Sequence, residues 1–245
     1  MFCLLSKINS CKWVFIEIKY YAYKHLFYYT DNSTFLKAFD EICNGKFTND
    51  TDFENVSYLE VAECIDAELE ANIRTWTGVT KRGFYNYILF DGGKLKKVFR
   101  KFKETELAGE TLSDMERIQA VMGCAFYIGK GRADRSLHHF KEAKDGGCSS
   151  NKAEKIREIW KQYQGIIIHQ FFNHSTSFEA STREAILIDF IGKHNLTNER
   201  KGTYYGKVDA WGVPKIFNMG FYYALLALKR MTIQRQNEFL MDDIM

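Results

Sequence analysis

Hydrophobic and polar positions divide the chain after its first quarter into short β-rich runs and longer stripes at helical spacing. Runs of aromatic and β-branched residues predict strands, because such side chains pack well on a pleated surface. The expected strands are Phe84–Phe90, Ala125–Ile128 and Gly165–Phe172. Apolar residues three and four apart predict amphipathic helices. The expected helices are Ser57–Trp76, Lys94–Lys103, Ser113–Met122, Asn151–Tyr163, Ser177–Ile191 and Val213–Arg230.

The first fifth of the chain has no such period. Residues 1–47 are rich in aromatics, most densely at Tyr20–Tyr29, and a strand, a buried helix or a contact surface would each suit them. The polar segment Asn49–Asn55 then predicts a turn or linker. Periodicity therefore assigns no structure to this part.

The helix expected at Ser57–Trp76 separates apolar from acidic residues. Its apolar stripe is Tyr58, Ala62, Ile65, Leu69, Ile73 and Trp76, and its acidic side is Glu60, Glu63, Asp66, Glu68 and Glu70. An acidic face is a poor contact for DNA, so we expect this helix to pack against the rest of the protein with its acids in water.

One carboxylate stands out on the helix expected at Ser177–Ile191, for which Ser177 is a candidate cap. Glu184 lies on the apolar stripe formed by Ala180, Leu187, Ile188 and Ile191. A carboxylate there is costly unless a cation or a donor meets it. Glu179, by contrast, is four residues before Arg183, and we expect the two to form a surface salt bridge.

The totals indicate a folded, mildly basic protein. Of 245 residues, 46% are hydrophobic and 16% aromatic, which excludes general disorder, and the net charge is only +3. Affinity for nucleic acid must therefore come from local clusters. Lys94–Lys103 holds six basic residues in ten. It is either a solvated helix face or a phosphate-contacting one formed by Lys96, Lys97, Arg100 and Lys101.

Cysteine spacing and hydropathy indicate an intracellular protein of the nucleus, the cytoplasm or both. The six cysteines form no C-x-x-C pair, which is typical of free thiols in a reducing compartment. His169 and His174 lack cysteine or carboxylate partners at ligand spacing, so zinc is not expected. We find neither a signal peptide nor an apolar run long enough to span a bilayer, and expect no membrane contact.

The stretch Cys124–Phe140 predicts a buried strand, a Gly-Lys-Gly turn and the start of a basic helix. Lys130, Arg132 and Arg135 gather where helix-start N–H groups would also face an anion. Arg135 and His139 share one helix face, with His138 as a rival to His139. A strand, turn and helix with a solvated basic face would look the same.

Five ordered matches resolve this ambiguity. Tyr127-Ile128-Gly129-Lys130-Gly131 resembles the second half-motif of the GIY-YIG nucleases, and Tyr87 stands where the first half-motif keeps its tyrosine. Arg135 with His139, Glu184 and Asn198 resemble the family's helix pair, metal-binding glutamate and closing asparagine. Glu179-Ala180, Arg183-Glu184-Ala185, Leu196-Thr197-Asn198 and Gly202–Gly206 narrow the resemblance to the C-terminal nuclease domain of animal ankyrin-repeat-and-LEM-domain endonucleases.

The resemblance covers residues 81–245 and implies an α/β (α+β) fold, with a small, mainly antiparallel sheet flanked by helices. We expect an N-terminal extension of unknown role (1–80), a nuclease domain (81–206) with an insertion at 94–123, and a C-terminal helical extension packed on it (207–245). No ankyrin period or LEM-like segment is found, so the targeting and partners of those relatives are not carried over.

The implied activity is hydrolysis of DNA phosphodiester bonds, with branched or flapped DNA favoured and one Mg²⁺ or Mn²⁺ as cofactor. Glu184 would hold the metal and Arg135 would stabilise charge on the phosphate. Tyr87 would take the proton of the attacking water or position that water, while Tyr127 and His139 would orient the phosphate and relay the proton. Asn198 would pin loops near the cleft, and Lys130 and Arg132 would contact phosphate.

Two other functions remain open. The same scaffold could be a non-catalytic nucleic-acid-binding module, although all five matched positions carry the catalytic residue types. A helical interaction protein with a chance motif would lack the strands at Phe84–Phe90 and Gly165–Phe172.

Overall fold

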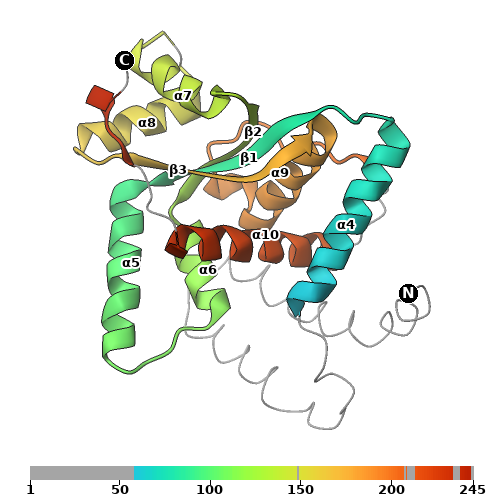
Figure 1. Cartoon of the computed structure of the whole chain (residues 1–245). Helices are drawn as coiled ribbons and strands as arrows, with labels where there is room; N and C mark the ends of the chain where they lie inside the picture. The colour runs from blue at the N-terminus through green and yellow to red at the C-terminus, as the bar shows by residue number, and fades with distance from the viewer. Residues whose placement is uncertain (1–57, 148, 207, 209–212, 234–237, 244–245) are drawn as a thin grey trace.

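A computed structural model describes residues 58–245 except 148, 207, 209–212, 234–237 and 244–245 (Figure 1). The aromatic-rich residues 1–47 and the expected linker at 49–55 lie outside the described residues. The most N-terminal element described is the helix α4 (Tyr58–Thr77).

A four-stranded antiparallel sheet forms the centre of the described part of the chain. Its strands are β1 (Arg82–Asp91), β2 (Ala125–Arg132), β3 (Ile166–Thr176) and β4 (Glu238–Phe239), in the order β2-β1-β3-β4. The three predicted strands are confirmed, and each extends beyond its apolar run. The α+β fold class with a mainly antiparallel sheet is confirmed as well.

The predicted Gly-Lys-Gly turn is wrong, because β2 continues through it to Arg132. Gly129 lies opposite Tyr87, and Gly131 lies opposite Tyr85 on β1. A Cβ on Gly129 would be 2.5 Å from the Cζ and hydroxyl oxygen of Tyr87, and one on Gly131 would be 2.9 Å from the Tyr85 hydroxyl. The glycines therefore leave room for two tyrosine rings that lie across the neighbouring strand, rather than bending the chain.

Helices cover both faces of the sheet, because alternate residues of β1 point to opposite sides. Tyr85, Tyr87 and Leu89 pack against α7 (Arg135–Lys144) and α8 (Asn151–Lys161). On the other face, Ile88 and Phe90 pack against α6 (Asp114–Met122), α9 (Ser177–Ile191) and α10 (Val213–Ile233). The protein therefore has three layers, with the sheet in the middle (Figure 1).

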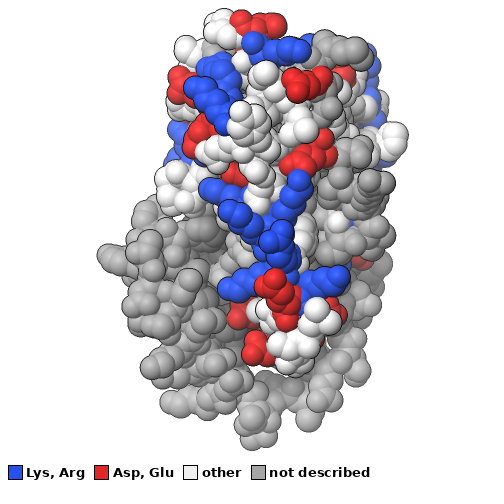
Figure 2. All heavy atoms as spheres, turned by 90° about the vertical axis from the view of Figure 1, so that its left-hand side faces the viewer, with Lys and Arg blue, Asp and Glu red and all other residues white. Residues whose placement is uncertain are grey.

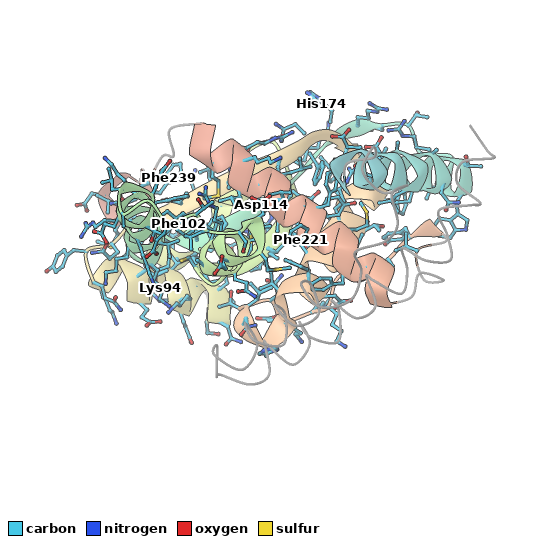
Figure 3. The ribbon with its side chains drawn as sticks, turned by 90° about the horizontal axis from the view of Figure 1, so that it is seen from below. Lys94, Phe102, Asp114, His174, Phe221 and Phe239 are labelled. Carbon is cyan, nitrogen blue, oxygen red and sulfur yellow. The ribbon has the colours of Figure 1, made fainter. Side chains whose placement is uncertain are left out.

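The segment between β1 and β2, where we expected an insertion, forms α5 (Gly92–Leu107) and α6. Seen from below in Figure 3, α10 crosses the molecule obliquely, with α6 and then α5 beside it. Phe102 on α5 and Phe221 on α10 both pack against the apolar core. The inner side of α5 is thus held by packing, as its apolar positions predicted.

Side chains cap the starts of α6 and α9. Ser113, where the sequence predicted a helix to start, caps α6 and forms a capping box with Glu116. Helix α9 begins at Ser177, but its cap is Thr176, whose side chain accepts from the amide of Glu179. No described helix is both long and apolar enough to span a bilayer.

The expected surface salt bridge between Glu179 and Arg183 is wrong. Both side chains are 1% exposed, and each pairs with α4 instead. Arg183 donates to both oxygens of Asp66, at 3.2 and 2.9 Å, and to Glu70 at 2.7 Å. Helical spacing reveals only partners on the same helix, so it could not show that another helix supplies them.

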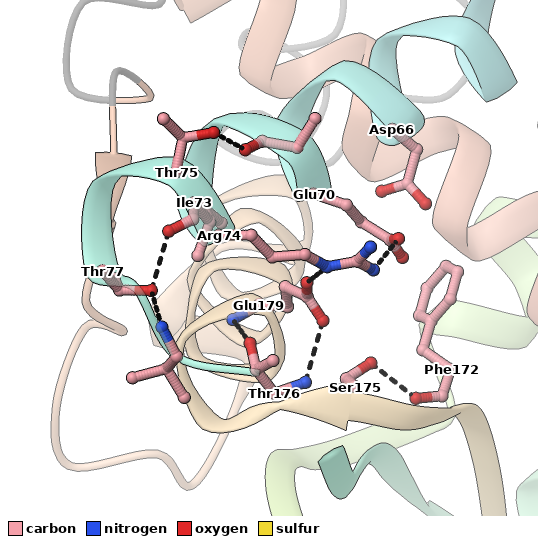
Figure 4. A network of polar contacts seen from close by, with 12 residues as sticks. Asp66, Glu70, Ile73, Arg74, Thr75, Thr77, Phe172, Ser175, Thr176 and Glu179 are labelled. Atoms are coloured by element: carbon pink, nitrogen blue, oxygen red, sulfur yellow. Dashed lines mark hydrogen bonds and ion pairs between the residues drawn. The ribbon is translucent and has the colours of Figure 1, made fainter. Parts of the chain in front are cut away.

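Glu179 has an equally complete set of partners (Figure 4). One of its carboxylate oxygens accepts from Arg74 Nε at 2.8 Å, and the other accepts from the backbone amide of Thr176 at 2.8 Å. The expected acidic, solvated side of α4 is therefore corrected at Asp66 and Glu70, which face α9. Trp76, expected on the buried stripe, is 65% exposed, with its ring centroid 6.1 Å from that of Tyr205.

Candidate active site

Two tyrosines and a histidine from three elements meet on the α7 side of the sheet. Tyr87 is central on β1 and only 1% exposed, and its ring centroid is 6.1 Å from that of Tyr127 on the edge strand β2. The His139 ring of α7 lies 5.8 Å from the Tyr87 ring and 5.3 Å from the Tyr127 ring. Three residues that sequence matching selected separately are therefore in mutual contact.

A short hydrogen bond joins Tyr87 to His139. The Tyr87 hydroxyl oxygen and His139 Nε2 are 2.5 Å apart, and both side chains are buried. Burial is the main cause that raises the pKa of Tyr87 above its ordinary value, and the neighbouring Tyr127 is the second. Burial is also the main cause that lowers the pKa of His139 to about 4, and the Lys152 ammonium is the second. At neutral pH both groups are therefore uncharged and share one proton in their hydrogen bond.

Glu142 and Lys152 belong to this cluster, although no sequence motif pointed to them. Glu142 Oε2 is 3.3 Å from His139 Nδ1 and 3.7 Å from Lys152 Nζ. The Lys152 ammonium also lies 4.8 Å from the centroid of the Tyr127 ring. Glu142 could have been found, since it follows His139 by three residues on one helix. Lys152 could not, because it lies on α8 in a different part of the sequence.

Arg135 and His139 border the same site from one helix, but only His139 faces the tyrosines. The Arg135 side chain is 49% exposed, and its guanidinium is 3.4 Å from Glu142. His138, the rival histidine, points elsewhere and is 3.1 Å from Asp134. Arg135 is thus a cation at the rim of the buried cluster, accessible to a ligand.

Glu184 is on α9, near the edge strand β2. It is half-buried, and burial raises its pKa to about 7, while the Lys130 ammonium acts in the opposite direction. Lys130 itself donates to the hydroxyl of Ser181, one turn before Glu184. Among the described residues no hydrogen bond or ion pair reaches the Glu184 carboxylate. The described residues therefore leave its oxygens available to a ligand.

The donor chemistry of Glu184 fits a hard divalent cation. Mg²⁺ is commonly held through one or two carboxylates, with water and substrate oxygens as its other ligands. No group of three or more His, Cys, Asp or Glu side chains able to hold a metal occurs in the part of the chain that the structure describes. A metal at this site would accordingly depend on Glu184 and on the substrate.

Asn198 lies at the outer edge of β2. Its side-chain oxygen accepts from the backbone amide of Ile128 at 3.0 Å, and its side-chain nitrogen donates to the carbonyl of Ile128 at 2.7 Å. The backbone amide and hydroxyl of Thr197 both donate to the carbonyl of Phe126. These bonds hold the loop after α9 against the strand that carries Tyr127.

The remaining predicted cations are on the surface in two places. Arg132 is exposed at the end of β2. Lys96, Lys97, Arg100 and Lys101 are exposed on α5, where Lys and Arg side chains gather in Figure 2. Helix α5 follows Asp91 at one end of β1, whereas Arg132 pairs with Phe84 near the other end. The structure therefore does not bring the α5 cations together with Arg132.

Comparison with known proteins gives one family and three relatives. The family model for the LEM-3-like GIY-YIG domain matches residues 84–245. The mouse protein "Ankyrin repeat and LEM domain-containing protein 1" is 31% identical over 180 residues, which cover 70% of this chain and 32% of the relative. The human protein is 29% identical over 63% of this chain and 25% of its own length. A Caenorhabditis elegans homolog is 32% identical over 35% of this chain and 13% of its length.

The chain thus spans a third or less of each of these relatives. No solved structure is significantly similar to it.

Proposed function

The chain belongs to the LEM-3-like GIY-YIG domain family, a family of endonucleases, and we therefore propose that it hydrolyses phosphodiester bonds in DNA with the help of Mg²⁺ or Mn²⁺. The observation that carries this proposal is the chemistry gathered at the β2 edge. A buried tyrosine bonded to a neutral histidine lies close to an accessible arginine and to a carboxylate that no described residue binds. Phosphodiester hydrolysis needs a proton acceptor, a cation for the transition-state charge and a metal ligand.

Glu184 is the residue proposed to hold the metal. A bound divalent cation would polarise a phosphate oxygen and favour a nucleophilic water. Lys130 would attract the same phosphate; its ammonium acts on the Glu184 carboxylate and donates to the Ser181 hydroxyl, which supports this role.

Tyr87 is proposed to accept the proton of the attacking water. Its hydroxyl is hydrogen-bonded to His139 Nε2, and the proton can be shared through this bond. Arg135 would stabilise the charge that develops on the phosphate, because its planar guanidinium can donate two hydrogen bonds to one group. Tyr127 would orient the phosphate, and Arg132 would contact the backbone next to it. Asn198 would keep the Tyr127 strand in place without contacting the reacting atoms.

Branched or flapped DNA is the proposed substrate. The support is the resemblance to the LEM-domain endonucleases together with the two separate groups of exposed cations, one at the end of β2 and one along α5, the second of which is visible in Figure 2. Phosphate contacts from two places suit a substrate with more than one arm better than a single duplex. A DNA substrate also accords with the nucleus or cytoplasm, as the cysteines predict.

The test is incubation of the purified chain with labelled duplex, flap, junction and single-stranded DNA, with Mg²⁺, with Mn²⁺ and with a chelator. Cleavage that needs the metal and is lost in Tyr87→Phe is the expected result. Tyr87→Phe removes one hydroxyl and almost no volume, so the fold and DNA affinity should be kept. Metal-independent binding without any cleavage would instead favour the non-catalytic nucleic-acid-binding module.

A further inference from the structure

A line of four polar side chains runs from the proposed proton acceptor to the protein surface. Tyr87 on β1 is 2.5 Å from His139 on α7, His139 is 3.3 Å from Glu142 one turn later, and Glu142 is 3.7 Å from Lys152 on α8. Only the first two of these residues correspond to the family's motif. Glu142 and Lys152 have no role in the function proposed above.

The partners of His139 determine which of its nitrogens carries the proton. An ionised carboxylate only accepts hydrogen bonds, so His139 Nδ1 must donate to Glu142. Because the pKa of Glu142 is held below its ordinary value, partly through its bond to His139, this carboxylate is ionised at neutral pH. A neutral imidazole has a single N–H, and His139 Nε2 is then the acceptor that faces the Tyr87 hydroxyl.

We propose that Glu142 is a positioning residue that fixes this tautomer of His139, and that His139 takes the hydroxyl proton of Tyr87 while Tyr87 takes a proton from the attacking water. This inference rests on the proposed nuclease function. The O–H bond of water breaks as the new P–O bond forms, and the bond between phosphorus and the leaving oxygen breaks. The surplus proton resides on His139, which then carries protons on both nitrogens. His139 returns it to solvent through Tyr87 after cleavage, and the leaving oxygen takes a proton from water.

This route avoids a charge that the site disfavours. A free phenolate on Tyr87 would be buried beside Tyr127 and in the field of Glu184, both of which oppose it. Passing the proton on to His139 keeps Tyr87 neutral before and after the transfer. The resulting imidazolium is opposed first by burial and then by Lys152 and Arg135, and it is favoured by Glu142. Glu142 is thus the one group near His139, among the described residues, that offsets both cations.

A purely structural role for Glu142 is the alternative, since it also joins α7 to α8 through Lys152 and approaches Arg135. The two roles differ in a property that can be measured without DNA. If Glu142 fixes the tautomer, its removal should move the proton from Nδ1 to Nε2 of His139. If it only joins two helices, its removal should change stability and leave the tautomer as it is.

The first experiment is ¹⁵N NMR of the histidine rings in the full chain, with His139 assigned by its loss in His139→Gln. The wild type should show a neutral ring with the proton on Nδ1. Glu142→Leu should show the proton on Nε2, whereas Glu142→Gln, which keeps an acceptor oxygen, should retain Nδ1–H. A wild-type ring with its proton on Nε2 would overturn the proposal, and so would a Glu142→Leu ring that still has its proton on Nδ1.

The second experiment is single-turnover cleavage by the same variants. Glu142→Leu should cut about a hundredfold more slowly, with unchanged DNA affinity, because it loses most of one general-base contribution. Glu142→Gln should recover part of that rate. Glu158→Leu, which removes an exposed carboxylate from α8, is the matched control and should cut like the wild type. Wild-type rates in Glu142→Leu would overturn the relay.

The two experiments separate the relay from the nuclease function. A wild-type chain that cuts no DNA would overturn the proposed function. The NMR experiment would still decide the role of Glu142 in fixing His139.

Discussion

Helix α9 carries buried or partly buried charges on two of its sides, and only one side provides these charges with partners among the described residues. On the side that faces α4, Glu179 and Arg183 are almost completely buried, and each has several partners at 2.7–3.2 Å. On the side that faces β2, Glu184 is partly buried, and no hydrogen bond or ion pair from the described residues reaches it. Its pKa is raised to about 7 by that burial.

The difference separates charges that hold the fold from a charge that we propose binds a cation. Burial of an ion is costly, and the partners of Arg183 and Glu179 offset that cost within the protein. At Glu184 no described partner offsets the cost, and under the proposed function a divalent cation would offset it. The same helix thus fastens α4 to the domain with one side and presents a reactive carboxylate with the other. Each of the following predictions changes one side and measures both activity and stability.

The largest effect is expected from Glu184→Gln. Loss of the charge should lower the single-turnover rate by about a thousandfold or more, the upper range for removing one transition-state contact. DNA affinity should be unchanged, and stability should rise slightly because a partly buried carboxylate that no described residue binds is gone. The rate is measured with saturating enzyme and Mg²⁺. The matched change Glu179→Gln should reduce stability and keep the rate, and equal rates for both variants would remove Glu184 from the mechanism.

The same substitution at two arginines should have opposite effects. Lysine keeps the charge but loses the planar fork of donors. Arg135→Lys should slow cleavage by about a hundredfold to a thousandfold with no change in stability, because Arg135 is half exposed at the site rim. Arg183→Lys should keep the rate and lower the free energy of unfolding by about 3 kcal/mol, since Asp66, Glu70 and Ser175 would lose their shared donor.

Single-turnover kinetics and denaturant unfolding of both variants are the measurements. A stable, fully active Arg135→Lys protein would make this arginine a simple binding contact. A slow Arg183→Lys protein of normal stability would show that the α4 side of α9 takes part in catalysis.

Helix α4 precedes the residues matched by the family model, yet it supplies the partners of Arg183. Asp66→Ala should lower the free energy of unfolding by about 2 kcal/mol, because Arg183 and the hydroxyl of Tyr223 both lose an acceptor. The rate per folded molecule should not change. Glu63→Ala, on an exposed position of the same helix, is the control in urea unfolding. Equal stability of the two variants would contradict a structural role for this contact.

The smallest effect per residue is expected on α5, which is remote from both sides of α9. Replacing Lys96, Lys97, Arg100 and Lys101 with Gln should weaken binding to all DNA sequences and reduce the salt slope by about one unit per lost phosphate contact. Lys96 already pairs with Glu238 and should contribute least. Binding is measured between low and moderate salt. An unchanged slope would leave α5 as a solvated helix face.

The sequence predicted the helices and strands well, because the spacing of apolar residues and the capping of helix ends depend on residues that are close together in the chain. Glu184 could be selected from its place on an apolar stripe alone, and in the described part of the chain no hydrogen bond or ion pair reaches its carboxylate. The partners of Arg183 could not be predicted, since they come from a helix more than one hundred residues earlier in the chain. The turn predicted at Gly129 was wrong for the same reason. A glycine is required there because a Cβ would collide with the ring of Tyr87, which lies on another strand.

Asn198 closes an edge that would otherwise accept another chain. Strand β2 is the outer strand of the sheet, and a free edge strand is a template for pairing between molecules and for aggregation. The side chain of Asn198 occupies both backbone groups of Ile128, and Thr197 occupies the carbonyl of Phe126. Two residues thus serve in place of a fifth strand. A change at Asn198 should therefore appear first as poor solubility during expression and concentration, before any loss of activity in the molecules that remain monomeric.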